Sequence, residues 1–165
     1  MLKKWIMTGI CLLCLTGCAQ TTFETLGDVA HQQVLAPIAR EIVLQLPQDA
    51  VQAVWEGEAD IFYICEDYTI HLQTLEAGDI NSSIQIMSGF QKNALTVLES
   101  RCGDHGRYEW VWTAVAEEGD LVCRSVLLDD GNFHYALTLA ADASVAGSLS
   151  DQWNILISSF CLEDA

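Results

Sequence analysis

The stretch RYEWVWTAVAEEGDLVCRSVLLDDGNFHYALTLA, residues 107–140, decides the fold of this chain. It contains three runs in which apolar residues recur at every second position, separated by the turn segments EEGD and DDGN. Alternation with a period of two is typical of β-strands that bury one face. A fourth run, ALTVLESRC, precedes them after the turn GDHG. The sequence therefore predicts an antiparallel four-strand meander, with Asp130-Gly131 as a two-residue hairpin turn.

Short turns between these strands predict which residues lie opposite each other. Trp110 is then expected opposite Leu127, and Leu127 opposite His134. The predicted apolar face carries Leu98, Val111, Val115, Val122, Val126, Leu128, Phe133, Tyr135, Leu137 and Leu139. The predicted mixed, aromatic face carries Val97, Glu99, Trp110, Trp112, Cys123, Ser125, His134 and Thr138. A slip of one residue would exchange the two sets.

The C-terminal part predicts a helix from Ser144 to Phe160, with Ser144 as its N-cap. Apolar residues recur there at helical spacing and form a stripe that consists of Val145, Leu149, Trp153, Leu156 and Phe160. We expect this stripe to cover the apolar face of the meander.

Upstream of the meander, the pattern predicts strands over 38–46, 59–65 and 68–75. A short helix over 80–88 follows, with Asp79 as its N-cap and Gly89 as its stop. The predicted fold class is α+β, an antiparallel sheet with helices packed on its faces.

The segment YALTLAADASVAGSLSDQWNILISSF, residues 135–160, resembles the closing part of the PsbP-like α/β/α sandwich. The shared features are a last strand, a cap of small residues, a helix with a central tryptophan (Trp153) and Ser159-Phe160 at its end. Lipoproteins of gut bacteria are similar. The resemblance implies a scaffold or assembly factor and carries no catalytic motif.

The N-terminal sequence MLKKWIMTGICLLCLTGCAQ resembles the signal of bacterial lipoproteins. Lys3 and Lys4 precede an apolar run that is too short to span a bilayer, and Leu15-Thr16-Gly17-Cys18 follows as a lipobox. The chain is then divided into a signal peptide over 1–17, a lipidated tether with a possible short helix over 18–37 and one α+β domain over 38–165. The alternative is an ordinary secretory signal that contains a chance cysteine.

Lipidation of Cys18 implies a location outside the cytoplasm, anchored to the cell membrane or the outer membrane. The lipid is the expected membrane contact, because two or more acyl chains anchor a protein stably. Ala19 after the cysteine favours the outer membrane in a Gram-negative cell.

The charge of the chain excludes several partners. The 165 residues carry 23 Asp and Glu against seven Lys and Arg. Removal of the signal takes Lys3 and Lys4 and leaves a net charge of −18. Nucleic acid and anionic lipid head groups are disfavoured, because both need a basic surface. The charge favours solubility through self-repulsion and also permits a cationic partner.

Four cysteines remain in the domain: Cys65, Cys102, Cys123 and Cys161. An exported chain permits disulfides between them, whereas an anaerobe could keep the thiols free. The predicted register places Cys102 and Cys123 about 20 Å apart, which disfavours a bridge between these two.

No motif for a metal, a cofactor or catalysis is present. The four histidines, His31, His71, His105 and His134, lack metal-ligand spacing. The segment Asp129–Asn132 lacks the length and the closing Glu of an EF-hand, so a hairpin turn is favoured over a calcium loop. We therefore expect a non-enzymatic protein without a cofactor.

Two interpretations of the mixed, aromatic face remain open. Trp110, Trp112, Ser125 and His134 could line a groove for a peptide or a glycan, since indoles offer apolar area and an N–H donor. Alternatively, the segment Phe23–Val34 covers this face as a second helical layer. The favoured function is an interaction or assembly module for an unknown envelope protein, and the alternative is a small-ligand binder.

Overall fold

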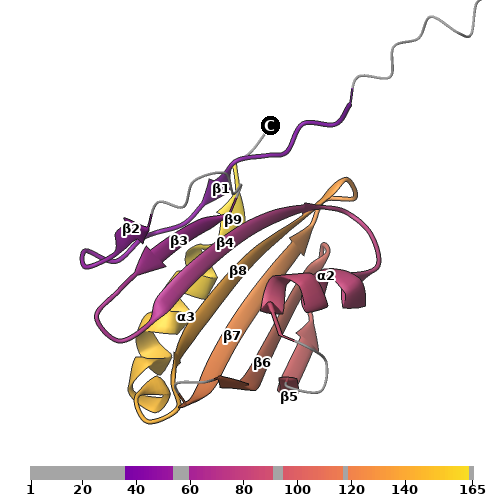
Figure 1. Ribbon diagram of the computed structural model, residues 1–165. Helices are drawn as coiled ribbons and strands as arrows, with labels where there is room; N and C mark the ends of the chain where they lie inside the picture. The colour runs from indigo at the N-terminus through magenta and orange to yellow at the C-terminus, as the bar shows by residue number, and fades with distance from the viewer. Residues whose placement is uncertain (1–35, 54–59, 91–94, 117–118, 164–165) are drawn as a thin grey trace, which may run out of the picture. The chain divides into compact units, whose positions relative to one another are not determined.

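Figure 1 shows a computed structural model of the chain, which describes residues 36–53, 60–90, 95–116 and 119–163. The residues from Pro37 onward form one compact unit. The predicted signal peptide over 1–17, and the tether as far as residue 35, lie outside the described residues.

A seven-stranded antiparallel sheet forms the centre of this unit (Figure 1). Its strands, in spatial order, are β2 (Val51–Ala53), β3 (Ile61–Ile64), β4 (Thr69–Glu76), β8 (Phe133–Asp142), β7 (Gly119–Asp129), β6 (Arg107–Ala116) and β5 (Leu95–Cys102). Strands β5 to β8 form the predicted meander. Helices α2 (Ile80–Ser88) and α3 (Ser150–Ser159) lie on opposite faces of the sheet. The predicted α+β class is therefore confirmed.

The register of the meander differs from the predicted one by two residues at both hairpins. Trp110 lies opposite Ser125, not Leu127. Leu127 lies opposite Ala136, not His134. The ladders continue into the expected turns: Ala116 pairs with Gly119, and the N–H of Asp130 donates to the carbonyl of Phe133 at 3.2 Å. A shift of two residues keeps every side chain on its predicted face.

A β-bulge changes the predicted face of Glu99. The pairing of β5 with β6 shifts between Val97, opposite Trp112, and Glu99, opposite Val111. The extra residue in a bulge reverses the alternation beyond it. Glu99 therefore lies on the α3 face, and its assignment to the tryptophan face was wrong.

The helices were predicted with unequal success. Helix α2 has the expected bounds: the Asp79 carboxylate accepts the N–H of Ser82 at 2.9 Å, and Gly89 ends the helix at φ +68°. Helix α3 begins six residues after the predicted start, behind a 3₁₀ turn, η3 (Ala146–Leu149). Ser144 is not its cap, because the Ser144 N–H and hydroxyl both donate to Asp142.

The predicted strand over 38–46 is also shorter than expected. Only β1 (Ile42–Val43) forms, and it pairs with β9 (Cys161–Leu162) in a separate two-stranded sheet. Neither β9 nor β2 was predicted.

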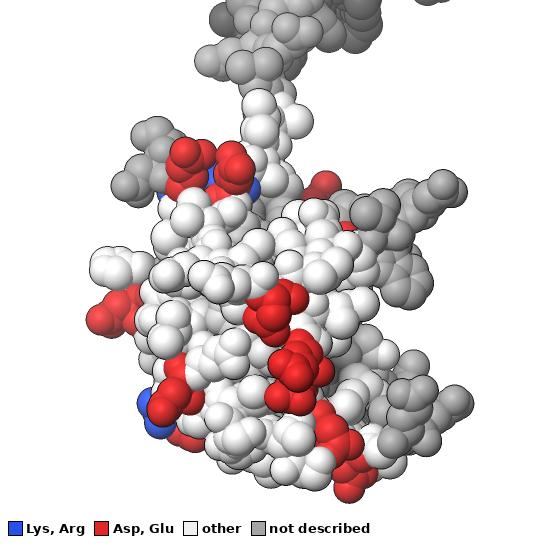
Figure 2. Space-filling view, turned by 90° about the vertical axis from the view of Figure 1, so that its left-hand side faces the viewer, with Lys and Arg blue, Asp and Glu red and all other residues white. Residues whose placement is uncertain are grey.

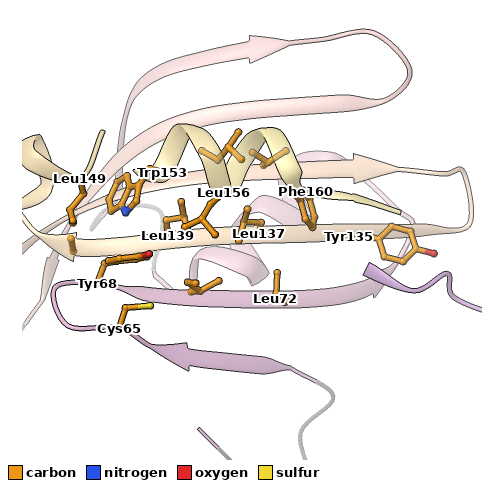
Figure 3. Close-up of a cluster of buried hydrophobic side chains, with 14 residues drawn as sticks. Cys65, Tyr68, Leu72, Tyr135, Leu137, Leu139, Leu149, Trp153, Leu156 and Phe160 are labelled. Carbon is orange, nitrogen blue, oxygen red and sulfur yellow. The ribbon is translucent and has the colours of Figure 1, made fainter. Parts of the chain in front are cut away.

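The main core lies between α3 and the sheet. Figure 3 shows Trp153 and Leu156 from α3, and Phe160 directly after it, beside Leu137 and Leu139 of β8. Ile70, Val126, Leu137 and Leu139 are fully buried. The helical stripe thus covers the central strands as expected. Leu98 and Val115, which were assigned to the same apolar face, remain 62% and 71% exposed in β5 and β6.

Candidate functional site

The four residues predicted to line a groove are core residues. Trp110 is 5% exposed, and Trp112, Ser125 and His134 are each 1% exposed. Because they are buried, these four side chains do not form the exposed groove that was predicted. Helix α2 supplies a cover for their face through Met87, which packs in the same apolar cluster as Trp110 and Trp112. The segment Phe23–Val34, which was expected to cover this face, lies outside the described residues.

The four residues do not form one group. The Trp112 indole N–H donates to the Ser125 hydroxyl at 2.9 Å, and the Ser125 and Thr138 hydroxyls lie 2.8 Å apart. His134 lies towards the other end of the face, where its Nδ1 is 2.7 Å from the hydroxyl of Ser83 in α2. These contacts satisfy polar groups inside the core.

A pocket opens beside this buried cluster, between the C-terminal end of α2 and strands β3 and β4. Its volume is about 380 Å³. Its floor includes Trp112 and Cys123, and Met87 and Phe90 form an apolar wall. We call it the α2-face pocket.

The polar side of the α2-face pocket is built around the Asp60 carboxylate. Asp60 Oδ2 accepts from Gln73 Nε2 at 2.9 Å and lies 3.1 Å from His71 Nε2. The His71 ring also stacks on Phe62, with a centroid separation of 3.7 Å. His71 and Gln73 point to the same face because they are two residues apart in β4.

Thr138 adds a hydroxyl on the same face. It lies opposite His71 in the β4–β8 ladder and lines the pocket. Because the Trp112 indole can only donate, Ser125 accepts from it. Either hydroxyl of the Ser125–Thr138 pair can be the donor between them.

A second depression, of about 610 Å³, lies on the opposite face of the sheet between α3 and strands β5–β7. We call it the α3-side groove. Val111 and Val122 line it, together with charged residues of neighbouring strands. Two of these charges have local partners: Arg101 pairs with Glu99, and Arg124 donates to Asn154 of α3 at 2.5 Å.

The four cysteines of the domain are free thiols in the structure. Cys65 and Cys123 are buried, whereas Cys102 and Cys161 are exposed. Burial raises the pKa of the Cys123 thiol to about 12, and burial also raises the pKa of the Cys65 thiol. Both are therefore neutral at physiological pH. The predicted lipidation site, Cys18, lies outside the described residues.

The described residues contain no cluster of three or more His, Cys, Asp and Glu side chains that could hold a metal ion. His105 lies in an exposed turn at φ +57°, and His31 falls outside the described part of the chain. No helix in the described ranges is long and apolar enough to cross a membrane.

Sequence reasoning did not identify Asp60, Gln73 or Thr138 as members of one site, and it treated His71 as an isolated residue. One usable signal was present in YTIHLQTL, where the polar residues Thr69, His71 and Gln73 alternate with apolar ones. No local sequence pattern predicts that β4 pairs with β8.

No protein-family model and no curated protein matches the sequence. The structure is similar to that of cyanobacterial PsbP (CyanoP) from Synechocystis, with a TM-score of 0.57 and 9% identity over 74% of this chain and 86% of that one. It is also similar to a protein of unknown function from Pseudomonas aeruginosa, described as a putative regulator. That match has a TM-score of 0.52 and 11% identity over 75% of this chain and 99% of the other.

A third similar structure is LpqN, involved in cell envelope biogenesis of Mycobacterium tuberculosis. Its TM-score is 0.48, with 17% identity over 89% of this chain and 100% of that one. The similarity to CyanoP shows that the fold is PsbP-like, as the resemblance of residues 135–160 implied. Identities this low show the fold alone.

Proposed function

We propose that this chain is a lipid-anchored extracytoplasmic protein that acts as a non-enzymatic interaction or assembly module for an envelope protein. The lipobox that ends at Cys18 supports the anchor. One observation carries the interaction: strand β5 and the adjoining part of the α3-side groove are exposed in the described part of the chain.

Strand β5 is an edge of the seven-stranded sheet, and every residue in it after Leu95 is exposed. An edge strand presents unpaired N–H and C=O groups, which an extended segment of another protein can pair with. Val97 and Leu98 are 48% and 62% exposed there, and Val115 of the next strand is 71% exposed. The proposed partner therefore contributes an extended, partly apolar segment.

The surface charge supports a protein partner over a nucleic acid or a lipid surface. Figure 2 shows acidic side chains in a diagonal row across one face of the molecule, with very few basic ones. Anionic partners would be repelled by such a face.

The interaction is tested by mild crosslinking of the lipidated protein in its own membranes, followed by affinity capture. We expect a reproducible envelope protein with the wild type, and its loss with Leu98→Lys and with Val115→Lys. Ile155→Lys is the matched control, because Ile155 is 57% exposed on α3. If all variants still capture the partner, the proposed binding surface is wrong. If the wild type captures no protein above background, the proposed function as an interaction module is wrong.

The anchor is tested with Cys18→Ser. We expect the wild type in the detergent-rich phase of a Triton X-114 separation and the variant in the aqueous phase, because the acyl chains supply the membrane affinity. The mass of the mature wild type should include the lipid on its N-terminal cysteine. A wild type without lipid mass would instead indicate an ordinary secretory signal.

A small-ligand binder is a second candidate function, and the α2-face pocket favours it. The ligand would bind in this pocket and not on an exposed tryptophan face. The floor of the pocket includes Trp112, and its polar groups lie on one side. Tryptophan fluorescence during titration with candidate ligands would test this function, with Trp112→Phe as the variant.

A further inference from the structure

We infer that the α2-face pocket binds a small protonated amine with a short apolar body. This inference rests on the second candidate function, ligand binding, and names the class of ligand. It follows from one buried acceptor without a partner, one carboxylate and an apolar wall.

The acceptor is the side-chain oxygen of Gln73. Gln73 is 6% exposed and lines the pocket, and its Oε1 has no hydrogen-bond partner among the described residues. The orientation of the amide is determined by Asp60, because only the NH₂ group can donate to a carboxylate. The amide oxygen is therefore the atom of the Gln73 side chain that is left without a partner. A buried acceptor without a donor is costly, and a ligand N–H would relieve that cost.

The charge of the pocket selects a cation over a neutral donor. Among the described residues that line it, Asp60 is the only carboxylate, and none is a Lys or an Arg. Gln73 and His71 both lie against one oxygen of this carboxylate, Oδ2. An ammonium group can donate to Gln73 Oε1 and Asp60 together, since it carries three donors. Charge-assisted hydrogen bonds of this kind are the strong ones.

The opposite side of the pocket suits an apolar body. Phe90 packs edge-on against Trp112, with ring centroids 5.8 Å apart, and Met87 lies in the same cluster. The Cys123 thiol in the floor stays neutral, because burial raises its pKa to about 12. A short alkyl chain is therefore favoured over a second charged group.

The test is calorimetric titration of the full chain in detergent micelles with n-butylamine at pH 7, compared with n-butanol. We expect saturable binding of the amine and at least tenfold weaker binding of the alcohol, because the alcohol lacks the charge. Asp60→Asn and Gln73→Met should each weaken amine binding about tenfold. Thermal unfolding of each variant checks that it is folded.

Glu76→Gln is the matched control, since Glu76 is an exposed carboxylate on the same strand and does not line the pocket. Equal affinity for amine and alcohol, an equal loss with Glu76→Gln or no saturable amine binding would each overturn the inference. If Asp60→Asn fails to fold, the affinity of Gln73→Met for the amine tests the inference by itself. The β5 and β6 variants of the capture experiment lie outside this pocket, so either proposal can fail without the other.

Discussion

At the scale of single residues, several polar side chains inside the sheet are stabilised by specific partners. Alternation predicted that Trp112, Ser125 and His134 share one face, but it did not predict what each one contacts. Ser125 satisfies the Trp112 indole, and Ser83 of α2 satisfies His134. A buried polar group is tolerated when such a partner is present.

Removal of the Ser83 hydroxyl should therefore destabilise the protein. Ser83→Ala leaves His134 Nδ1 without its partner, so we expect the free energy of unfolding to fall by about 1–2 kcal/mol relative to the control. Ser158→Ala is that control, because Ser158 is an exposed helical serine and shares the gain in helix propensity. Urea denaturation followed by circular dichroism measures both variants. Equal midpoints would contradict the role of this hydrogen bond.

The Asp130 carboxylate should make stability depend on pH. Partial burial alone would raise its pKa, but hydrogen bonds from the N–H groups of Phe133 and Asn132 and from the Tyr135 hydroxyl, together with the nearby charge of Arg40, lower it overall. A lowered folded-state pKa contributes stability at neutral pH that is lost as pH falls through the folded-state value.

Asp130→Asn should consequently be less stable than the wild type at pH 7, by about 0.5 kcal/mol, because solvent screens this partly exposed group. The difference should shrink as the pH falls below about 4, where free aspartate protonates. Urea denaturation at pH 7, 5 and 3 checks this. A difference that grows towards acid would contradict the assigned contacts.

At the scale of elements, the fold depends on contacts between segments that are distant in sequence. Arg107 at the start of β6 donates to the carbonyls of Ile157, at 2.9 Å, and Phe160, at 3.3 Å, where α3 ends. It also pairs with Glu109 at 2.8 Å. The carbonyls at a helix C-terminus carry partial negative charge, so a guanidinium there stabilises the helix and holds it against the sheet.

We expect Arg107→Met to lower the free energy of unfolding by about 2 kcal/mol, because two helix carbonyls and Glu109 lose a charged donor. Arg107→Lys should recover only part of the loss, since a single ammonium cannot reproduce the fork of donors. Arg101→Met serves as the comparison: Arg101 is 74% exposed and pairs only with Glu99 among the described contacts. If Arg101→Met lowers the free energy of unfolding as much as Arg107→Met does, the contact of Arg107 with the end of α3 does not explain the loss.

At the scale of the whole molecule, the excess of acidic residues opposes compaction. The net charge is −16 over 165 residues, and self-repulsion at this level destabilises the folded state. Exposed ion pairs such as Arg101–Glu99 offset little of it.

Screening this repulsion should raise the melting temperature. We expect Tm at pH 7 to rise by a few degrees between 20 and 300 mM NaCl, since the Debye length falls well below the size of the domain. Near pH 4.2, the isoelectric point of the sequence, the salt effect should largely vanish. A Tm that falls with salt at pH 7 would show that attractive ion pairs dominate.

Local pattern determined much of this protein by itself. Period-two alternation located the meander strands and their two faces, and Asp79 and Gly89 set the ends of α2, because these signals depend only on neighbouring residues. The pairing register was missed by two residues at both hairpins. At the β6–β7 hairpin the reason is that Gly119 and Asp120 resemble turn residues although they pair within the ladder. The bulge at Val97/Glu99 likewise left no mark in the alternation.

Only the tertiary structure decided where the chemistry lies. The pairing of β4 with β8 joins segments more than fifty residues apart and places His71 opposite Thr138. Together with α2 it forms the α2-face pocket. Packing of Met87 from α2 in the cluster with Trp110 and Trp112 also decided that the tryptophan face is covered, where the sequence leaves both a covered face and an exposed groove open. Such pairings are selected by the burial of both faces of the whole sheet at once, a condition that no short stretch of sequence contains.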